Sequence, residues 1–161
     1  MKHRFKNFNQ FDKQTNHIYL GILLSLLFAM TLAYYHNQKS FFSLDNSPIL
    51  LVTGFILTII SLSVMLYIFK STKETIKKQH NLSEKLNLYY NSFIIKLIFL
   101  WVSGITNSIF YYFTANKLFM VFSAILVLAI LMARPYADKL SKEFDASESE
   151  KVYFDAPDKN I

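Results

Sequence analysis

The chain has 161 residues and a formal net charge of +6, with 53% hydrophobic and 17% charged residues. A water-soluble domain would spread its apolar residues in periodic stripes, but here they are concentrated in four blocks separated by short polar segments. The absence of cysteine excludes disulfides, thiolate metal sites and cysteine nucleophiles. We therefore predict an all-α membrane protein, a four-transmembrane-helix bundle.

The four apolar blocks define a predicted transmembrane domain over residues 18–133, preceded by a basic cytoplasmic tail over residues 1–17. Each block is close to the length that a helix needs to cross about 30 Å of hydrocarbon. A cleaved signal peptide is disfavoured, because the first apolar run is long and bulky tyrosines follow its TLA segment. The predicted spans are about 18–35, 49–69, 93–113 and 118–133.

Local signals define several helix ends. Ser47 is a predicted N-cap and Pro48 a first helical residue, so the second span starts there. Residues 70–92 are predicted to form a helical hairpin extension whose second helix begins near Asn81. This hairpin is either a solvated helix pair or a basic surface for anionic lipid or a partner protein. Residues 114–117, TANK, predict a tight turn between antiparallel third and fourth spans.

Residues 134–161 are predicted to be a cytoplasmic C-terminal tail. Tyr136, Leu140 and Phe144 are four residues apart, which is typical of a short amphipathic helix. The acidic DASESEK segment that follows predicts disorder. The closing VYFDAPDKNI is either a frayed end or a short docking segment, because its apolar residues have nothing local to pack against.

Charge predicts the orientation. Fourteen of the 17 Lys and Arg residues fall in the two tails and in the 70–92 segment, while the other two loops hold only Lys39 and Lys117. The positive-inside rule therefore predicts that both termini are cytoplasmic. Lys, Asn, Ile and Phe are favoured over Arg, Ala and Gly, which suggests an AT-rich bacterial genome. The predicted location is the bacterial inner (cytoplasmic) membrane, as a multi-pass protein.

Three polar residues of the third span, Lys96, Ser103 and Asn107, share one helix face because they are seven and four residues apart. Lys96 is near the cytoplasmic edge, so its stem can carry the ammonium group to the headgroups. Asn107 is too deep for this, and its amide needs a partner on another helix. We interpret the face as a helix-packing surface, with the lining of a hydrophilic path as the alternative.

The other spans offer small residues that let backbones approach closely. They are Gly21, Ser25 and Ala29, four residues apart in the first span, and Gly54 and Thr58 in the second.

The spans lack the ionisable groups of several functional classes. None contains Asp or Glu, and the four histidines are at or beyond the predicted span ends. A proton-coupled transporter normally needs an intramembrane carboxylate, and a membrane haem needs a pair of ligands. The acidic residues do not have the spacing of a metal site either. We predict no cofactor, no metal and no nucleic-acid partner.

The predicted function is that of a non-enzymatic accessory, scaffolding or assembly subunit of a membrane complex. Its partners would be the lipid bilayer and other membrane subunits, or further copies of the chain. The alternative is an oligomeric, uncoupled channel or facilitator whose path is lined by Lys96, Ser103 and Asn107. An enzyme acting on lipid substrates is less favoured, since only His80, Glu84 and the Tyr89–Tyr90 pair are at the interface.

Overall fold

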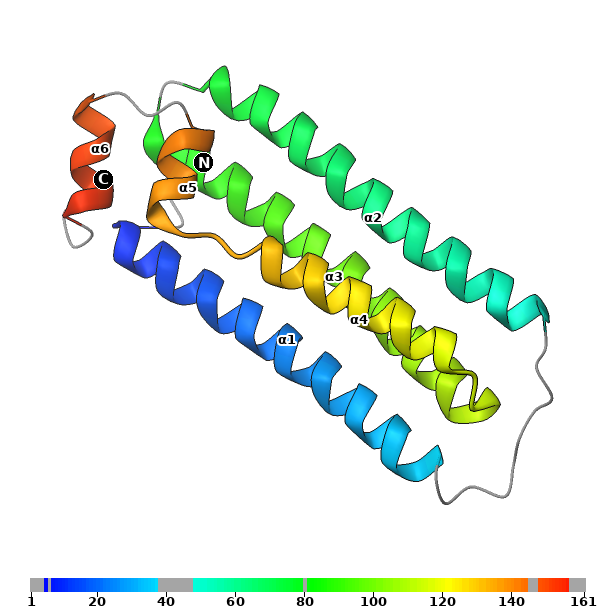
Figure 1. Cartoon of the computed structure of the whole chain (residues 1–161). Helices are drawn as coiled ribbons and strands as arrows, with labels where there is room; N and C mark the ends of the chain where they lie inside the picture. Colours follow the sequence, from blue (N-terminus) through cyan, green and yellow to red (C-terminus); the bar gives the residue numbers. More distant parts are fainter. Residues whose placement is uncertain (1–4, 6, 38–47, 80, 145–147, 157–161) are drawn as a thin grey trace.

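The structure is a computed structural model that describes the chain except residues 1–4, 6, 38–47, 80, 145–147 and 157–161. Within the described residues all regular elements are helices, which confirms the all-α prediction (Figure 1). The helices are α1 (Phe8–Asn37), α2 (Pro48–Lys77), α3 (Leu82–Thr114), α4 (Lys117–Met132), α5 (Ala137–Glu143) and α6 (Glu148–Asp155).

Three helices, α1, α2 and α3, are long and apolar enough to cross a membrane. Helix α4 is also apolar, but it has only 16 residues and covers about 24 Å. The outward surface of α1 and α2 carries large exposed apolar side chains such as Leu24, Phe28 and Leu66. Such a surface suits contact with lipid, so the chain is a membrane protein.

Helix α3 is the central element of the bundle and packs against α1, α2 and α4 (Figure 1). In its most apolar stretch 44% of the residues are buried, against 17% in α1 and in α2. Leu86, Phe93, Leu97 and Leu100 of α3 are fully buried in the core. Polar residues on the buried faces of α3 are therefore surrounded by other helices of the bundle.

The helices extend beyond the predicted spans at one end of the bundle. Helix α1 begins at Phe8 and α3 at Leu82, while α2 continues to Lys77. We call this the basic end, because Lys13, Lys77 and Lys85 are on its helix ends. The polar residues beyond the apolar stretch remain helical, because the backbone hydrogen bonds of a helix form within the helix and do not depend on a lipid environment.

Two predicted helix starts can be compared with the structure. Helix α2 begins at Pro48, as predicted, whereas the predicted N-cap Ser47 is outside the described residues. Asn81 is the N-cap of α3, and its side-chain oxygen accepts a hydrogen bond of 2.9 Å from the Ser83 amide. Pro48 and Asn81 thus mark the starts of α2 and α3, as the sequence predicts.

The C-terminal tail packs on the basic end (Figure 1). The sequence predicts disorder over residues 145–151; residues 145–147 are outside the described residues, and helix α6 begins at Glu148. The Phe154 ring is 4.9 Å from Phe8 and 6.2 Å from Phe144, measured between ring centroids. Lys85 Nζ is 2.8 Å from Glu150 Oε1. Tertiary contacts thus supply the partners that the tail lacks locally.

The turn between α3 and α4 contains a left-handed residue. Ala115 has φ 56° and ψ 7°, and its amide donates to the Tyr111 carbonyl at 2.9 Å. Asn116 then caps α4 by accepting from the Leu118 amide. An alanine in this conformation is strained, because its Cβ crowds the following carbonyl.

Replacing Ala115 by glycine should raise the free energy of unfolding by about 1 kcal/mol, since glycine adopts this conformation without strain. Thermal unfolding in detergent micelles measures the change. The control is Ala124→Gly at an exposed position inside α4, where the same substitution should destabilise by about 0.5–1 kcal/mol. Equal losses in both variants would contradict strain at Ala115.

Candidate functional site

The polar residues of α2 and α3 meet in the middle of the bundle. Asn107 is fully buried, and its Nδ2 donates to Thr58 Oγ1 at 3.1 Å and to the Ser103 carbonyl at 3.0 Å. Thr58 Oγ1 donates in turn to the Gly54 carbonyl at 2.8 Å. We call Gly54, Thr58, Ser103 and Asn107 the Asn107 cluster. It pairs a buried amide with a neighbouring helix of the same chain, as an apolar environment requires.

Gly54 allows α2 to approach the amide. A Cβ atom at this position would be 2.6 Å from Asn107 Oδ1 and 2.8 Å from the Phe119 ring. Both distances are shorter than real Cβ contacts allow, so with any larger residue the Asn107 amide or the Phe119 ring must shift. The position of the Asn107 amide and the Phe119 ring against α2 therefore depends on glycine.

A second group of hydroxyls, on α3 and α4, was not anticipated from the sequence. Ser123 Oγ donates to the Gly104 carbonyl at 3.1 Å and is 3.4 Å from Ser108 Oγ. Both serines are buried. Ser123 is the one polar residue between Leu118 and Ala133, and this isolation is the signal that could have identified it.

The small residues of α1 have separate surroundings. Ser25 Oγ accepts a hydrogen bond of 2.8 Å from Trp101 Nε1, which ties α1 to α3. Nothing would be within 4 Å of a Cβ atom at Gly21, so that residue does not serve close packing inside this chain. Ala29 lines an apolar groove of about 330 Å³ between α1 and α3, together with Ala33 and Ile105.

Lys96 lies on α3 between the Asn107 cluster and the basic end, and it does not belong to the cluster. Its side chain is only 4% exposed, and Nζ is 5.5 Å from the Phe69 ring centroid and 5.4 Å from that of Tyr89. Its side chain extends toward the basic end and shares a small cavity there with Glu143 of α5. The tail therefore covers the end of this lysine.

Glu143 is the acidic neighbour of that lysine. Burial raises the pKa of the Glu143 carboxyl above its ordinary value, and the ammonium groups of Lys139, Lys96 and Lys73 oppose this shift. The electrostatic link between α3 and α5 was invisible in the sequence, because the two residues are far apart along the chain.

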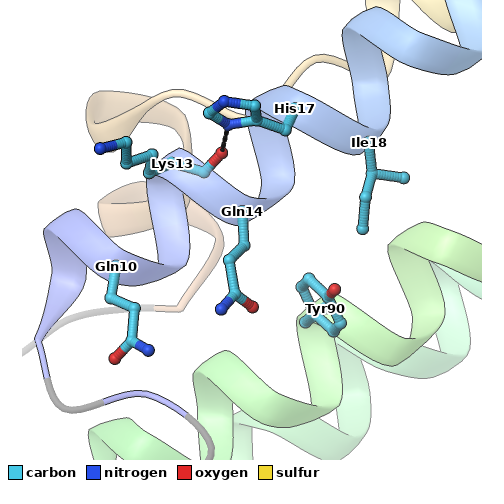
Figure 2. A pocket seen from close by; sticks show the side chains of 6 residues that line it. All are labelled: Gln10, Lys13, Gln14, His17, Ile18 and Tyr90. Carbon is cyan, nitrogen blue, oxygen red and sulfur yellow. Dashed lines mark hydrogen bonds between the residues drawn. The ribbon is translucent and has the colours of Figure 1, made fainter.

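The basic end also has a groove of about 490 Å³ between α1 and α3, shown in Figure 2. The amides of Gln10 and Gln14 point toward α3 and Tyr90, whereas Lys13 and His17 extend from the outer side of α1. His17 Nδ1 is 2.5 Å from the Lys13 carbonyl. Because these groups do not converge on one point, the groove lacks the geometry of an acid–base site.

The chemistry available in the Asn107 cluster is hydrogen bonding. Its members are an amide, two hydroxyls and backbone carbonyls, and within the described residues neither Asn107 Oδ1 nor Ser103 Oγ has a hydrogen-bond partner. Among the described residues, no group of three or more His, Asp and Glu side chains is placed to hold a metal ion. Of the interfacial residues considered for lipid chemistry, Tyr89 and Tyr90 are buried and His80 is outside the described residues.

Comparison of the chain with models of known protein families, with curated proteins and with solved structures gave no match. The function is therefore inferred from the contacts described above.

Gly54→Ala should lower the free energy of unfolding by about 1–3 kcal/mol, because the added methyl group overlaps Asn107 and Phe119. Gly21→Ala is the matched control, since open space surrounds that position. It should be neutral or stabilise by up to about 1 kcal/mol. Unfolding in detergent titrated with a denaturing surfactant measures both, and equal effects would show that the Asn107 cluster is not tightly packed.

Proposed function

We propose that this protein is a small multi-pass protein of the bacterial inner membrane, in which α4 also crosses and both termini are cytoplasmic. We further propose that it acts as a non-enzymatic accessory, scaffolding or assembly subunit of a larger membrane complex. Its partners would be other membrane subunits.

Contacts between the two tails support the fourth crossing. Phe154 of α6 packs on Phe8 at the start of α1, and Glu150 pairs with Lys85 at the start of α3. The ends of the described chain are therefore on one side of the bundle (Figure 1). An even number of crossings accounts for this, and the distribution of Lys and Arg indicates that this side is cytoplasmic.

The observation that carries the functional proposal is that most polar groups at mid-bundle form hydrogen bonds within the chain; Asn107 Oδ1 and Ser103 Oγ are buried but have no partner within the described residues. Asn107, Thr58, Ser108 and Ser123 are buried between helices and bond to one another or to backbone carbonyls. What the bundle offers to its surroundings is apolar surface, including the groove at Ala29. Small residues such as Ala29 and Ala33 in the groove lining let another transmembrane helix approach closely.

The groove at Ala29 supplies a test of this assignment. Ala29→Leu should fill the groove and remove a stoichiometric partner from the protein purified from native membranes in mild detergent. Val121→Leu, which adds bulk on the exposed side of α4, should leave the partner bound. Size-exclusion chromatography with light scattering measures the stoichiometry, and it separates a partner subunit from a second copy of the chain.

A monomeric wild-type protein from native membranes would contradict the proposal. Ion flux through liposomes that contain only this chain would favour the channel alternative, provided that Lys96→Ala and Asn107→Leu both abolish it. We expect no such flux, because Asn107 is enclosed by α2 and α3.

The orientation is tested by single-cysteine labelling, which the cysteine-free chain allows without further changes. Lys117→Cys, in the α3–α4 turn, should react with a membrane-impermeant maleimide added to spheroplasts. Lys78→Cys, after α2, should react only once the membrane is permeabilised. Both lysines are exposed, so reactivity reports the side of the membrane. The reverse pattern, or labelling of both from one side, would contradict the proposed topology.

A further inference from the structure

A surface cavity of about 200 Å³ at the basic end is lined by residues of α2 and α5 and by the segment before α5. Its lining residues are Lys73, Tyr136, Lys139, Lys142 and Glu143. Lys73 and Lys139, which are 66 positions apart along the chain, thus line one cavity together with Lys142.

The lining has an excess of positive charge. Three lysines face it with Glu143 as the one carboxylate among the lining residues. One carboxylate cannot balance three ammonium groups, so the lining keeps a net positive charge. The cavity is therefore suited to an anion.

The cavity is at the level where the apolar helix surfaces end. Lys139 Nζ donates to the Met132 carbonyl at 3.0 Å, and Met132, the last residue of α4, is 77% exposed. On α2, Lys73 follows one turn after Phe69, the last residue of the apolar block. In a bilayer, ammonium groups at this level reach the headgroups, while Met132 remains beside the acyl chains.

We propose that Lys73, Lys139 and Lys142 bind the phosphate group of an anionic phospholipid of the cytoplasmic leaflet. Lysine is a point-charge ligand for phosphate, and several lysines together select anionic over zwitterionic headgroups. Exposed apolar surface next to Lys139 favours a lipid over a free phosphate, because it gives the acyl chain a place to lie. The choice of leaflet rests on the orientation proposed above, which cysteine labelling tests separately.

The bound lipid would connect the tail to the bundle. Lys139 and Lys142 are on α5, whereas Lys73 is on α2, so one phosphate group contacts both elements. The site therefore combines lipid selection with attachment of the tail.

The test is native mass spectrometry of the full-length protein in detergent, titrated with phosphatidylglycerol or with phosphatidylcholine of the same chain length. The wild type should retain phosphatidylglycerol preferentially. Lys73→Gln and Lys142→Gln should each weaken its binding about fivefold. Glu143→Gln should strengthen it, because the competing carboxylate is removed. Lys70→Gln, which removes the same charge one turn earlier on α2 but outside the cavity, should have no effect.

Three outcomes would overturn the proposal. Equal retention of the two lipids would show that the cavity does not select anionic headgroups. An equal loss in Lys70→Gln would show that only the overall charge matters. If inorganic phosphate at millimolar concentration displaces the lipid, the cavity is a site for free phosphate. Lys142 is exposed, so Lys142→Gln should fold normally, and its melting temperature checks this.

Discussion

The structure depends on one constraint: an amide buried among hydrocarbon must find its hydrogen-bond partners within the protein. The amide nitrogen of Asn107 meets it by donating to Thr58 on α2 and to a carbonyl of its own helix, whereas Oδ1 has no partner within the described residues. That bond requires α2 and α3 to lie close together, which Gly54 permits because it has no side chain. Phe119 of α4 then fills the space beside Gly54. Asn107 and Gly54 thus bring α2, α3 and α4 into contact at one point of the bundle.

The basic end is organised by different forces. Phe8, Phe144 and Phe154 form an aromatic cluster that joins the two chain ends. The pair Lys85–Glu150 is largely buried beside it. A buried ion pair adds little net stability, yet it penalises any arrangement that leaves one charge unpaired, so it favours a single position of α6. Because α5 also covers Lys96, the tail is part of the fold. In the proposed function this end would hold anionic lipid, while the opposite end of α1 and α3 would meet a partner helix.

Local signals in the sequence predicted the helix starts and turns well. Pro48 begins α2 and Asn81 caps α3, because each acts through its own backbone and its nearest neighbours. The helical extension of α2 and α3 beyond the membrane spans was also predicted, whereas residues 8–17, predicted to be a tail, belong to α1 because hydropathy reports only where a helix is apolar. Helix α6 was missed for a related reason. Its aromatic residues and Glu150 find partners only on segments distant in the chain, which no local pattern reveals.

The sequence by itself determined that the chain is helical and membrane-bound, and that Asn107 needs a partner, because hydrocarbon offers no hydrogen bonds to an amide or a bare backbone. Only the tertiary structure shows that Thr58 is the partner of Asn107. The same holds for the hydrogen bonds from Ser123 to the Gly104 carbonyl and from Trp101 to Ser25, and for the electrostatic interaction of Glu143 with Lys96. In water, a hydrophobic stripe shows which face of a helix is buried. In a membrane, the lipid-facing and protein-facing sides are both apolar, so helix rotation and register become visible only once the helices are packed.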